Sequence, residues 1–169
     1  TFGNRISAFD VHDDGSLGPR RDWASFGSLP TSADLETVLG GQLVVAPDGC
    51  SVLDAEGCLW VADALGGRAI RVREGGEIVD AVEPGTGVYA CGLGGADGRT
   101  LYLCTAPDFL EHNRRDAREA AVLATGTAYP FPAKFIESET GVARARLARM
   151  RRGLEQVERV LVVGAGAVG

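Results

Sequence analysis

The chain has 169 residues, of which 45% are hydrophobic, and a net charge of −6 at neutral pH. This length suits one domain with a substantial core, and the acidic balance leaves no broad basic surface for a nucleic acid. A small neutral or anionic substrate is compatible with this charge. No apolar run approaches the roughly 18 residues that suggest a membrane span, so we expect neither a membrane partner nor a targeting segment. The chain begins with Thr1 rather than Met, so it is expected to be either processed or a fragment.

In chain order, the first predicted element is a hairpin, in which residues 5–11 form a strand and residues 13–15 a turn. Residues 27–46 interrupt the strand pattern with Pro, Thr, Ser and Asp, and we interpret them as a loop insertion. Within this insertion, residues 35–39 are expected to form one or two helical turns.

A repeated unit then follows. Residues 54–57 form an acidic turn before the apolar strand 59–62, and residues 95–98 form a similar turn before the strand 101–104. Between the two copies, residues 68–82 predict a further hairpin that turns at Glu74-Gly75-Gly76. The copies lie about 40 residues apart, and a period of ~40 to 50 residues built from short strands is typical of propeller blades.

The four cysteines lie in or beside the apolar, strand-like runs of this region. They show neither a Cys-x-x-Cys spacing nor a nearby His that would complete a zinc site. We interpret them as reduced thiols that behave as small hydrophobic residues, and we therefore expect a cytoplasmic protein. The cysteines are Cys50, Cys58, Cys91 and Cys104.

From about residue 111 the sequence becomes charged and Ala-rich, and we expect the strand pattern to end there. Farther on, spacings of three and four between apolar residues predict an amphipathic helix, and its arginines indicate a solvated face. An apolar strand at 159–163 then leads into a Gly-x-Gly-x-x-Gly turn. The apolar helix face consists of Leu147, Met150, Leu154 and Val157, and the turn contains Gly164, Gly166 and Gly169.

Asp48 is the residue that we expect to carry chemistry. In Pro47-Asp48-Gly49 it falls at a strand entrance, where a propeller points side chains into its central channel. A carboxylate there can hold Ca²⁺, Mg²⁺ or Mn²⁺, and such a cation could polarise a substrate carbonyl while water attacks. An ordinary turn is the alternative reading of these three residues. We interpret three other carboxylates, Asp10, Asp63 and Asp108, as turn or strand-end residues.

Residues 47–63, 66–68, 91–95 and 101–109 resemble the gluconolactonase, senescence marker protein and luciferin-regenerating enzyme family. The resemblance covers about residues 1–120. It implies a six-bladed propeller with one divalent metal (Ca, Zn, Mg or Mn), a small-molecule lactone as substrate, and Asp48 as metal ligand and general base. The remaining ligands of the family, a Glu of the first blade and Asn residues of the middle blades, would lie upstream of Thr1. We therefore expect little activity from this chain alone.

A second resemblance concerns residues 122–135, the predicted helix and the final glycine turn. These are similar to the centre of FAD-dependent NADH:quinone oxidoreductases related to apoptosis-inducing factor. The resemblance implies that Gly164, Gly166 and Gly169 contact the pyrophosphate of NAD(P)H, with FAD as the other cofactor. The helix that should follow the turn is missing, so we expect weak dinucleotide binding. A flexible Gly/Ala-rich tail is the alternative.

Together these patterns predict a mainly β fold. Residues 1–120 would form a partial six-bladed β-propeller of about two to three blades, and residues 121–169 an amphipathic helix followed by a truncated Rossmann-type strand and glycine turn. Residues 121–125 fit either the last strand of the lactonase or the strand that precedes the Ala-Thr-Gly of the flavoprotein.

The predicted function is metal-dependent hydrolysis of a sugar lactone. One alternative is a fragment of an FAD-dependent NADH oxidoreductase. The other is a non-catalytic product that joins two incomplete genes, by recombination or by sequence misassembly, and that self-associates through its exposed blade edges.

Overall fold

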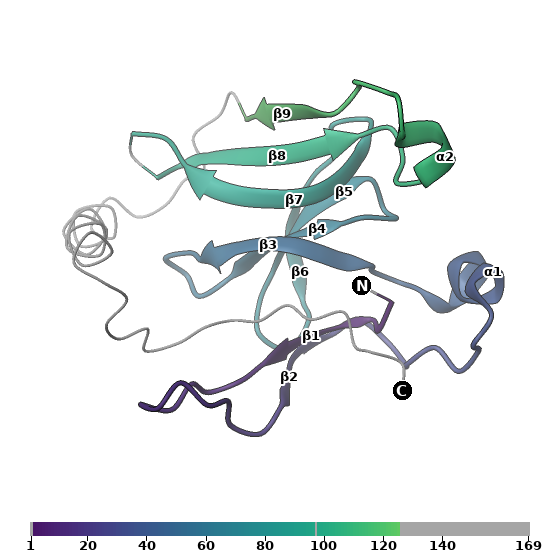
Figure 1. The fold of residues 1–169 in the computed structure, drawn as a ribbon. Coiled ribbons are helices and arrows are strands. Elements are labelled where there is room, and N and C mark those ends of the chain that lie inside the picture. Colours follow the sequence, from purple (N-terminus) through teal and green to yellow (C-terminus); the bar gives the residue numbers. More distant parts are fainter. Residues whose placement is uncertain (1, 97, 126–169) are drawn as a thin grey trace.

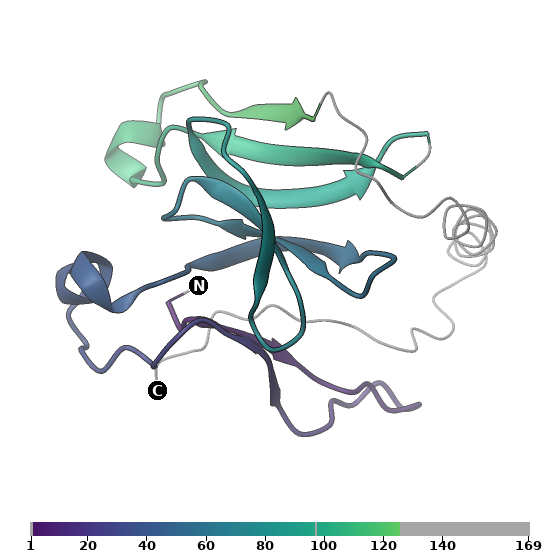
Figure 2. The same ribbon diagram turned by 180° about the vertical axis from the view of Figure 1, so that it is seen from behind.

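Three antiparallel sheets stack on one another in the computed structural model, which describes residues 2–96 and 98–125 (Figure 1). Both views place the second sheet between the first and the third (Figures 1 and 2). The first sheet pairs β1 (Arg5–Ala8) with β2 (Arg21–Ser25). The second contains β3 (Pro47–Leu53), β4 (Leu59–Asp63), β5 (Arg68–Val72) and β6 (Ile78–Val82). The third contains β7 (Gly87–Gly94), β8 (Thr100–Ala106) and β9 (Ala121–Ala124).

In every sheet, strands that follow one another along the chain are also neighbours in space. This arrangement confirms the predicted mainly β fold and all of the predicted hairpins. The first hairpin has a shorter ladder than expected, because β1 ends at Ala8 and only an isolated bridge between Val11 and Leu17 continues it. Gly15, at the tip of this hairpin, has a φ of 82°, which a glycine adopts at little cost.

Every residue of β4 is buried, and the strand contributes side chains to both apolar clusters of the core. Successive side chains of a strand point to opposite faces of the sheet. Leu59 and Val61 accordingly pack in a cluster with the first sheet, whereas Trp60 and Ala62 pack in a cluster with the third. Burial of each of the larger side chains stabilises the fold by about 1.5–3 kcal/mol. β5 contributes in the same way, with Ile70 and Val72 in the first cluster and Ala69 in the second. The second sheet is therefore joined to the other two by apolar side chains on both of its faces.

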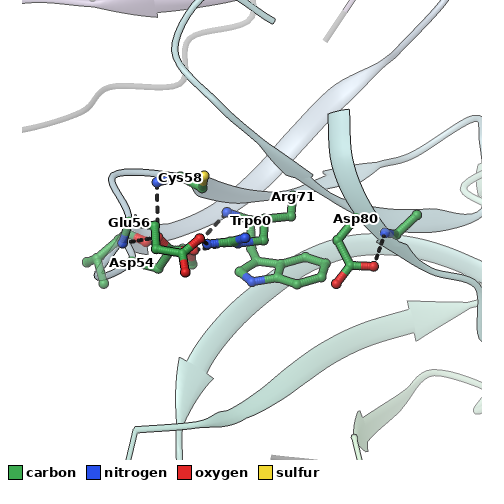
Figure 3. Close-up of polar contacts among 9 residues, drawn as sticks. Asp54, Glu56, Cys58, Trp60, Arg71 and Asp80 are labelled. Atoms are coloured by element: carbon green, nitrogen blue, oxygen red, sulfur yellow. Dashed lines mark hydrogen bonds and ion pairs between the residues drawn. The ribbon is translucent and has the colours of Figure 1, made fainter. Parts of the chain in front are cut away.

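Asp54 stabilises the turn between β3 and β4 through hydrogen bonds, and Arg71 of β5 forms an ion pair with its carboxylate (Figure 3). The Asp54 carboxylate accepts hydrogen bonds from the backbone N–H groups of Glu56 at 2.9 Å and Cys58 at 3.0 Å. Its other oxygen pairs with Nε of Arg71 at 2.7 Å, and Arg71 also reaches Glu56 at 2.9 Å. The Asp54 side chain is only 1% exposed, so the guanidinium neutralises a buried charge.

The insertion over residues 27–46 contains the predicted helical turns. They are α1 (Leu35–Thr37) and the wider turn η1 (Val38–Gln42), which follows it directly. Asp34 begins the segment, because its carboxylate accepts a hydrogen bond from the backbone N–H of Thr37 at 2.9 Å.

The third sheet continues beyond the point where the sequence predicted the strand pattern to end. After the short helix α2 (Glu111–Arg114), β9 pairs with β8 from Ala121 to Ala124. The expected stop near residue 111 is therefore wrong. The missing signal is alternation, because all four residues of β9 are exposed small or aliphatic residues. This pairing corresponds to the reading of residues 121–125 as the last strand of the propeller portion.

All four cysteines are free, as expected. Burial raises the pKa of the Cys91 thiol to about 12 and also raises the pKa of Cys50, so both thiols stay protonated at neutral pH. Within residues 2–96 and 98–125, no helix is long and apolar enough to cross a membrane.

Candidate active site

Asp48 lies in a β-bulge at the beginning of β3. Pro47 pairs with Asp63 of β4 and Cys50 pairs with Val61, so β3 contains one residue more than β4 over this stretch. A bulge of this kind disrupts the ladder locally and changes the direction of side chains, which is why bulges occur beside active sites. The bulge therefore gives Asp48, which is half-buried, a direction that a regular strand would not give it.

A second bulge lies on β7, the strand of the third sheet that packs beside β3. Val88 pairs with Thr105 and Ala90 pairs with Cys104, so the intervening Tyr89 has no partner in the ladder. Gly49 of the first bulge lies close to the carbonyl of Tyr89, because a Cβ on Gly49 would be 3.0 Å from that carbonyl oxygen. The two bulges therefore lie against each other.

Tyr89 is the residue of the second bulge whose backbone lies against Gly49. Its ring lies over Gly87, where a Cβ would be 2.5 Å from the Tyr89 hydroxyl, and it meets Phe109 edge-on with 6.3 Å between ring centroids. Partial burial raises the pKa of the Tyr89 hydroxyl above its usual value, and the negative charges of Asp108 and Asp48 raise it further. The hydroxyl therefore stays protonated at neutral pH and can donate a hydrogen bond.

Asp108 follows β8 and begins the segment that leads into α2. Its carboxylate accepts hydrogen bonds from the backbone N–H of Leu110 at 2.9 Å and from the side-chain amide of Asn113 at 3.2 Å, and it pairs with Arg114. These contacts lower the pKa of Asp108 below its ordinary value, the Leu110 bond most of all. The expectation that Asp108 is a turn residue is confirmed.

Asp63 is a strand-end residue, also as expected. It closes β4 with a side chain that accepts hydrogen bonds from the backbone N–H groups of Ala46 at 3.0 Å and Gly66 at 3.2 Å, and from Nε of Arg68 at 3.0 Å. Gly66 has to be glycine, because a Cβ there would lie 2.2 Å from the Asp63 carboxylate. Asp10 is exposed just beyond β1. It takes part in the hairpin of β1 and β2 through its backbone carbonyl.

Asp48 differs from these other carboxylates in its polar contacts. Asp54, Asp63 and Asp108 are each held by backbone N–H groups and an arginine. Over residues 2–96 and 98–125, by contrast, the Asp48 carboxylate accepts no hydrogen bond and forms no ion pair. A half-buried carboxylate without protein partners keeps its oxygens available for a cation, a water molecule or a substrate.

Asp48, Tyr89 and Asp108 all come from one end of the stacked sheets. β3 and β7 begin there and β8 ends there, and both views place α1 and α2 at this same end (Figures 1 and 2). A hard divalent cation favours oxygen ligands, and Asp48 fits the role of one of them. Among the residues that the structure describes, no group of three or more His, Cys, Asp or Glu side chains could hold a metal ion. The metal-binding role of Asp48 therefore stays a prediction.

A family model described as the SMP-30/Gluconolactonase/LRE-like region matches residues 1–107. The chain belongs to this family. Among solved structures, this gluconolactonase-like chain is similar to a luciferin-regenerating enzyme, with a TM-score of 0.51 and 22% identity over 73% of this chain. It is also similar to regucalcin from Agrobacterium tumefaciens, a calcium-binding protein, with a TM-score of 0.49 and 19% identity over 73% of this chain. The match spans 38% of the length of each of these two proteins.

The likeness to the luciferin-regenerating enzyme supports the fold, and the three stacked sheets form a partial propeller. The family match confirms the resemblance on which Asp48 was selected. The amphipathic helix and the glycine turn with Gly164, Gly166 and Gly169 lie outside the described residues. Their assignment to NAD(P)H and FAD, and the division of the chain at residue 120, stay predictions.

Sequence reasoning missed Tyr89, whose bulge lies against the bulge that contains Asp48. The only local signal is glycine: Gly49 follows Asp48 in one bulge, and Gly87 precedes Tyr89 in the other. Glycines inside strands often mark bulges or close backbone approaches. These glycines do not by themselves fix the strand register that creates the two bulges.

Proposed function

We propose that this chain supplies Asp48 to the active site of a metal-dependent hydrolase that opens a sugar lactone. The main support for the proposal is the half-buried Asp48 carboxylate, which lies in a bulge and has no polar partner among the described residues. By contrast, the carboxylates of Asp54, Asp63 and Asp108 all accept hydrogen bonds from the protein. Membership of the gluconolactonase-like family supports the substrate class. Further oxygen ligands would come from parts of the site beyond the described residues.

In the proposed reaction, residues at the end of the sheets where β3 begins act on water and on the lactone ring. Asp48 accepts a proton from water as the water oxygen bonds to the lactone carbonyl carbon. The ring C–O bond then breaks, and the proton passes to the departing ring oxygen, which gives the open hydroxy acid. Tyr89 belongs to the bulge that lies against that of Asp48, and its hydroxyl can donate a hydrogen bond to the substrate. A bound divalent cation would polarise the carbonyl.

Hydrolysis of gluconolactone, followed by acid release at constant pH, tests this proposal. The wild-type chain is compared with Asp48→Ala in the presence of Mn²⁺, Zn²⁺ or Ca²⁺, and Asp10→Ala serves as a control that removes an exposed carboxylate. We expect a slow, metal-stimulated rate that Asp48→Ala abolishes and Asp10→Ala preserves. Equal rates in the wild type and Asp48→Ala would falsify the catalytic role of Asp48.

Direct binding of Mn²⁺ gives a second measurement, because the electron paramagnetic resonance signal of free Mn²⁺ falls when the ion binds. Asp48→Asn keeps the shape of the side chain but removes its charge, and we expect it to bind Mn²⁺ more weakly than the wild type. If both proteins bind the ion equally, Asp48 is not a ligand.

A further inference from the structure

Asn4 joins the first sheet to both ends of the insertion that precedes Asp48. Its side-chain nitrogen donates hydrogen bonds to the backbone carbonyls of Ser28 at 2.9 Å and Gln42 at 2.7 Å. Its side-chain oxygen accepts hydrogen bonds from the backbone N–H groups of Val44 at 2.8 Å and Val45 at 3.4 Å. An Asn amide has two N–H donors and two acceptor positions, so this buried side chain uses its whole hydrogen-bonding capacity.

The backbone at Asn4 also favours this residue type. Asn4 has a φ of 50°, the one positive value among non-glycine residues that the structure describes. Asn enters this left-handed region more readily than most residues, whereas β-branched residues are strained there. Its own carbonyl accepts a hydrogen bond from the N–H of Phe26 at 2.8 Å, so the backbone of Asn4 fixes the residue that directly precedes the insertion, while its side chain binds the insertion itself.

The residues held by Asn4 lead directly into the bulge that carries Asp48. Val44 and Val45 are fixed by the Asn4 side-chain oxygen, and the next residue, Ala46, donates its N–H to Asp63 at 3.0 Å. The carbonyl of Ala46 in turn accepts a hydrogen bond from the N–H of Ala64 at 3.0 Å. Two buried polar side chains, Asn4 just before β1 and Asp63 at the end of β4, therefore hold the backbone just before Asp48.

We propose that Asn4 is a positioning residue for Asp48. It contacts neither Asp48 nor a substrate, and it acts by fixing residues 44–46, so that the bulge presents the Asp48 carboxylate in one direction. The role in lactone hydrolysis rests on the function proposed above. The hydrogen-bonding role can be measured independently of that function.

Two variants separate the contributions of the Asn4 side chain. Asn4→Gly keeps the left-handed backbone accessible and removes all four side-chain hydrogen bonds. Asn4→Asp keeps an acceptor for Val44 and Val45 but cannot donate to Ser28 or Gln42. Ile70→Val is the matched control, because it removes one methylene group from the core at a residue that makes none of these contacts. All proteins are compared at the same interval below their own Tm.

The first measurement is amide hydrogen exchange. In Asn4→Gly we expect exchange at residues 44–46 to rise about tenfold or more, because these amides lose a buried acceptor or its support. Exchange at residues 59–63 should stay unchanged. Asn4→Asp should protect Val44 and Val45 better than Asn4→Gly does, and Ile70→Val should show no selective change. Uniform exchange changes across the chain in Asn4→Gly would overturn the local role of Asn4.

The second measurement is Mn²⁺ binding, which separates positioning from simple stabilisation. We expect Asn4→Gly to weaken Mn²⁺ binding by about tenfold or more, because loss of a group that orients a metal ligand typically costs roughly 10- to 100-fold in metal affinity, and we expect Ile70→Val to bind Mn²⁺ like the wild type. Faster exchange at residues 44–46 with wild-type Mn²⁺ affinity would show that Asn4 is only structural. Asp48→Asn binding Mn²⁺ as tightly as the wild type would overturn the proposed function and, with it, the part that Asn4 plays there.

Discussion

Gly49 lies so close to Ala90 that no side chain fits between the two strands. A Cβ on Gly49 would be 2.6 Å from the Cβ of Ala90 and 2.8 Å from its Cα. The requirement for glycine after Asp48 therefore comes from the neighbouring sheet rather than from turn geometry. It also ties the direction of Asp48 to the packing between the second and third sheets.

We accordingly expect Gly49→Ala to destabilise the protein by about 1–3 kcal/mol, the usual cost of overpacking a core. Gly92→Ala is the control, because it is also a strand glycine but has open space around its Cβ position. It should be neutral or slightly stabilising, since it lowers the entropy of the unfolded chain. Urea unfolding of the two variants checks this, and equal midpoints would show that β7 moves away from β3 without cost.

The pair of Asp54 and Arg71 gives a second prediction. Asp54→Asn keeps an oxygen for the backbone N–H groups of the turn but removes the charge that Arg71 faces (Figure 3). We expect a loss of about 1.5–3 kcal/mol, as for a hydrogen bond to a charged group. Glu77→Gln removes the charge from an exposed pair with Arg73 and should cost less than about 0.5 kcal/mol. Chemical unfolding at pH 7 distinguishes the two, and similar losses would contradict the difference in burial.

The hairpin turns at residues 54–57 and 95–98 were predictable from the sequence because their signals are local. In each of them an acidic residue and a glycine lie within four positions of each other. The bulges at Asp48 and Tyr89 were not, because they depend on the register against β4 and β8. The role of Asn4 was also hidden, since the partners of its side chain begin 24 residues away along the chain. Asp48 was identified from its position in Pro47-Asp48-Gly49 and from the family resemblance, whereas its lack of polar partners among residues 2–96 and 98–125 became visible only in three dimensions.

Asp108 leads to a pH prediction. Its pKa in the folded chain is lowered from an ordinary value of 3.8, chiefly by the Leu110 hydrogen bond. A lowered folded pKa stabilises the fold above the ordinary pKa, and this contribution disappears as the pH falls through the folded pKa. The Tm advantage of the wild type over Asp108→Asn should therefore be present at pH 7 and shrink below about pH 4. An advantage that is constant from pH 7 to pH 3 would contradict this assignment.

The outer face of the third sheet leads to the last prediction, which concerns self-association. Tyr102 and Val122 are 38% and 68% exposed, and Cys104 and Val122 help to line an apolar hollow of about 350 Å³ on this face. In the second sheet a fourth strand covers the edge of β5, but over the described residues β9 has β8 as its only neighbour. An apolar face beside an unpaired strand edge favours association with another sheet.

We therefore expect the chain to associate with itself as its concentration rises, and Val122→Lys to suppress this, because a charge on an edge strand opposes pairing. Leu17→Lys is the matched control. It replaces an aliphatic residue that is 51% exposed with the same charge, but in the hairpin of the first sheet. Light scattering coupled to size-exclusion chromatography over a range of loading concentrations measures the mass. If both lysine variants lower the mass equally, the effect comes from net charge and not from the edge of β9.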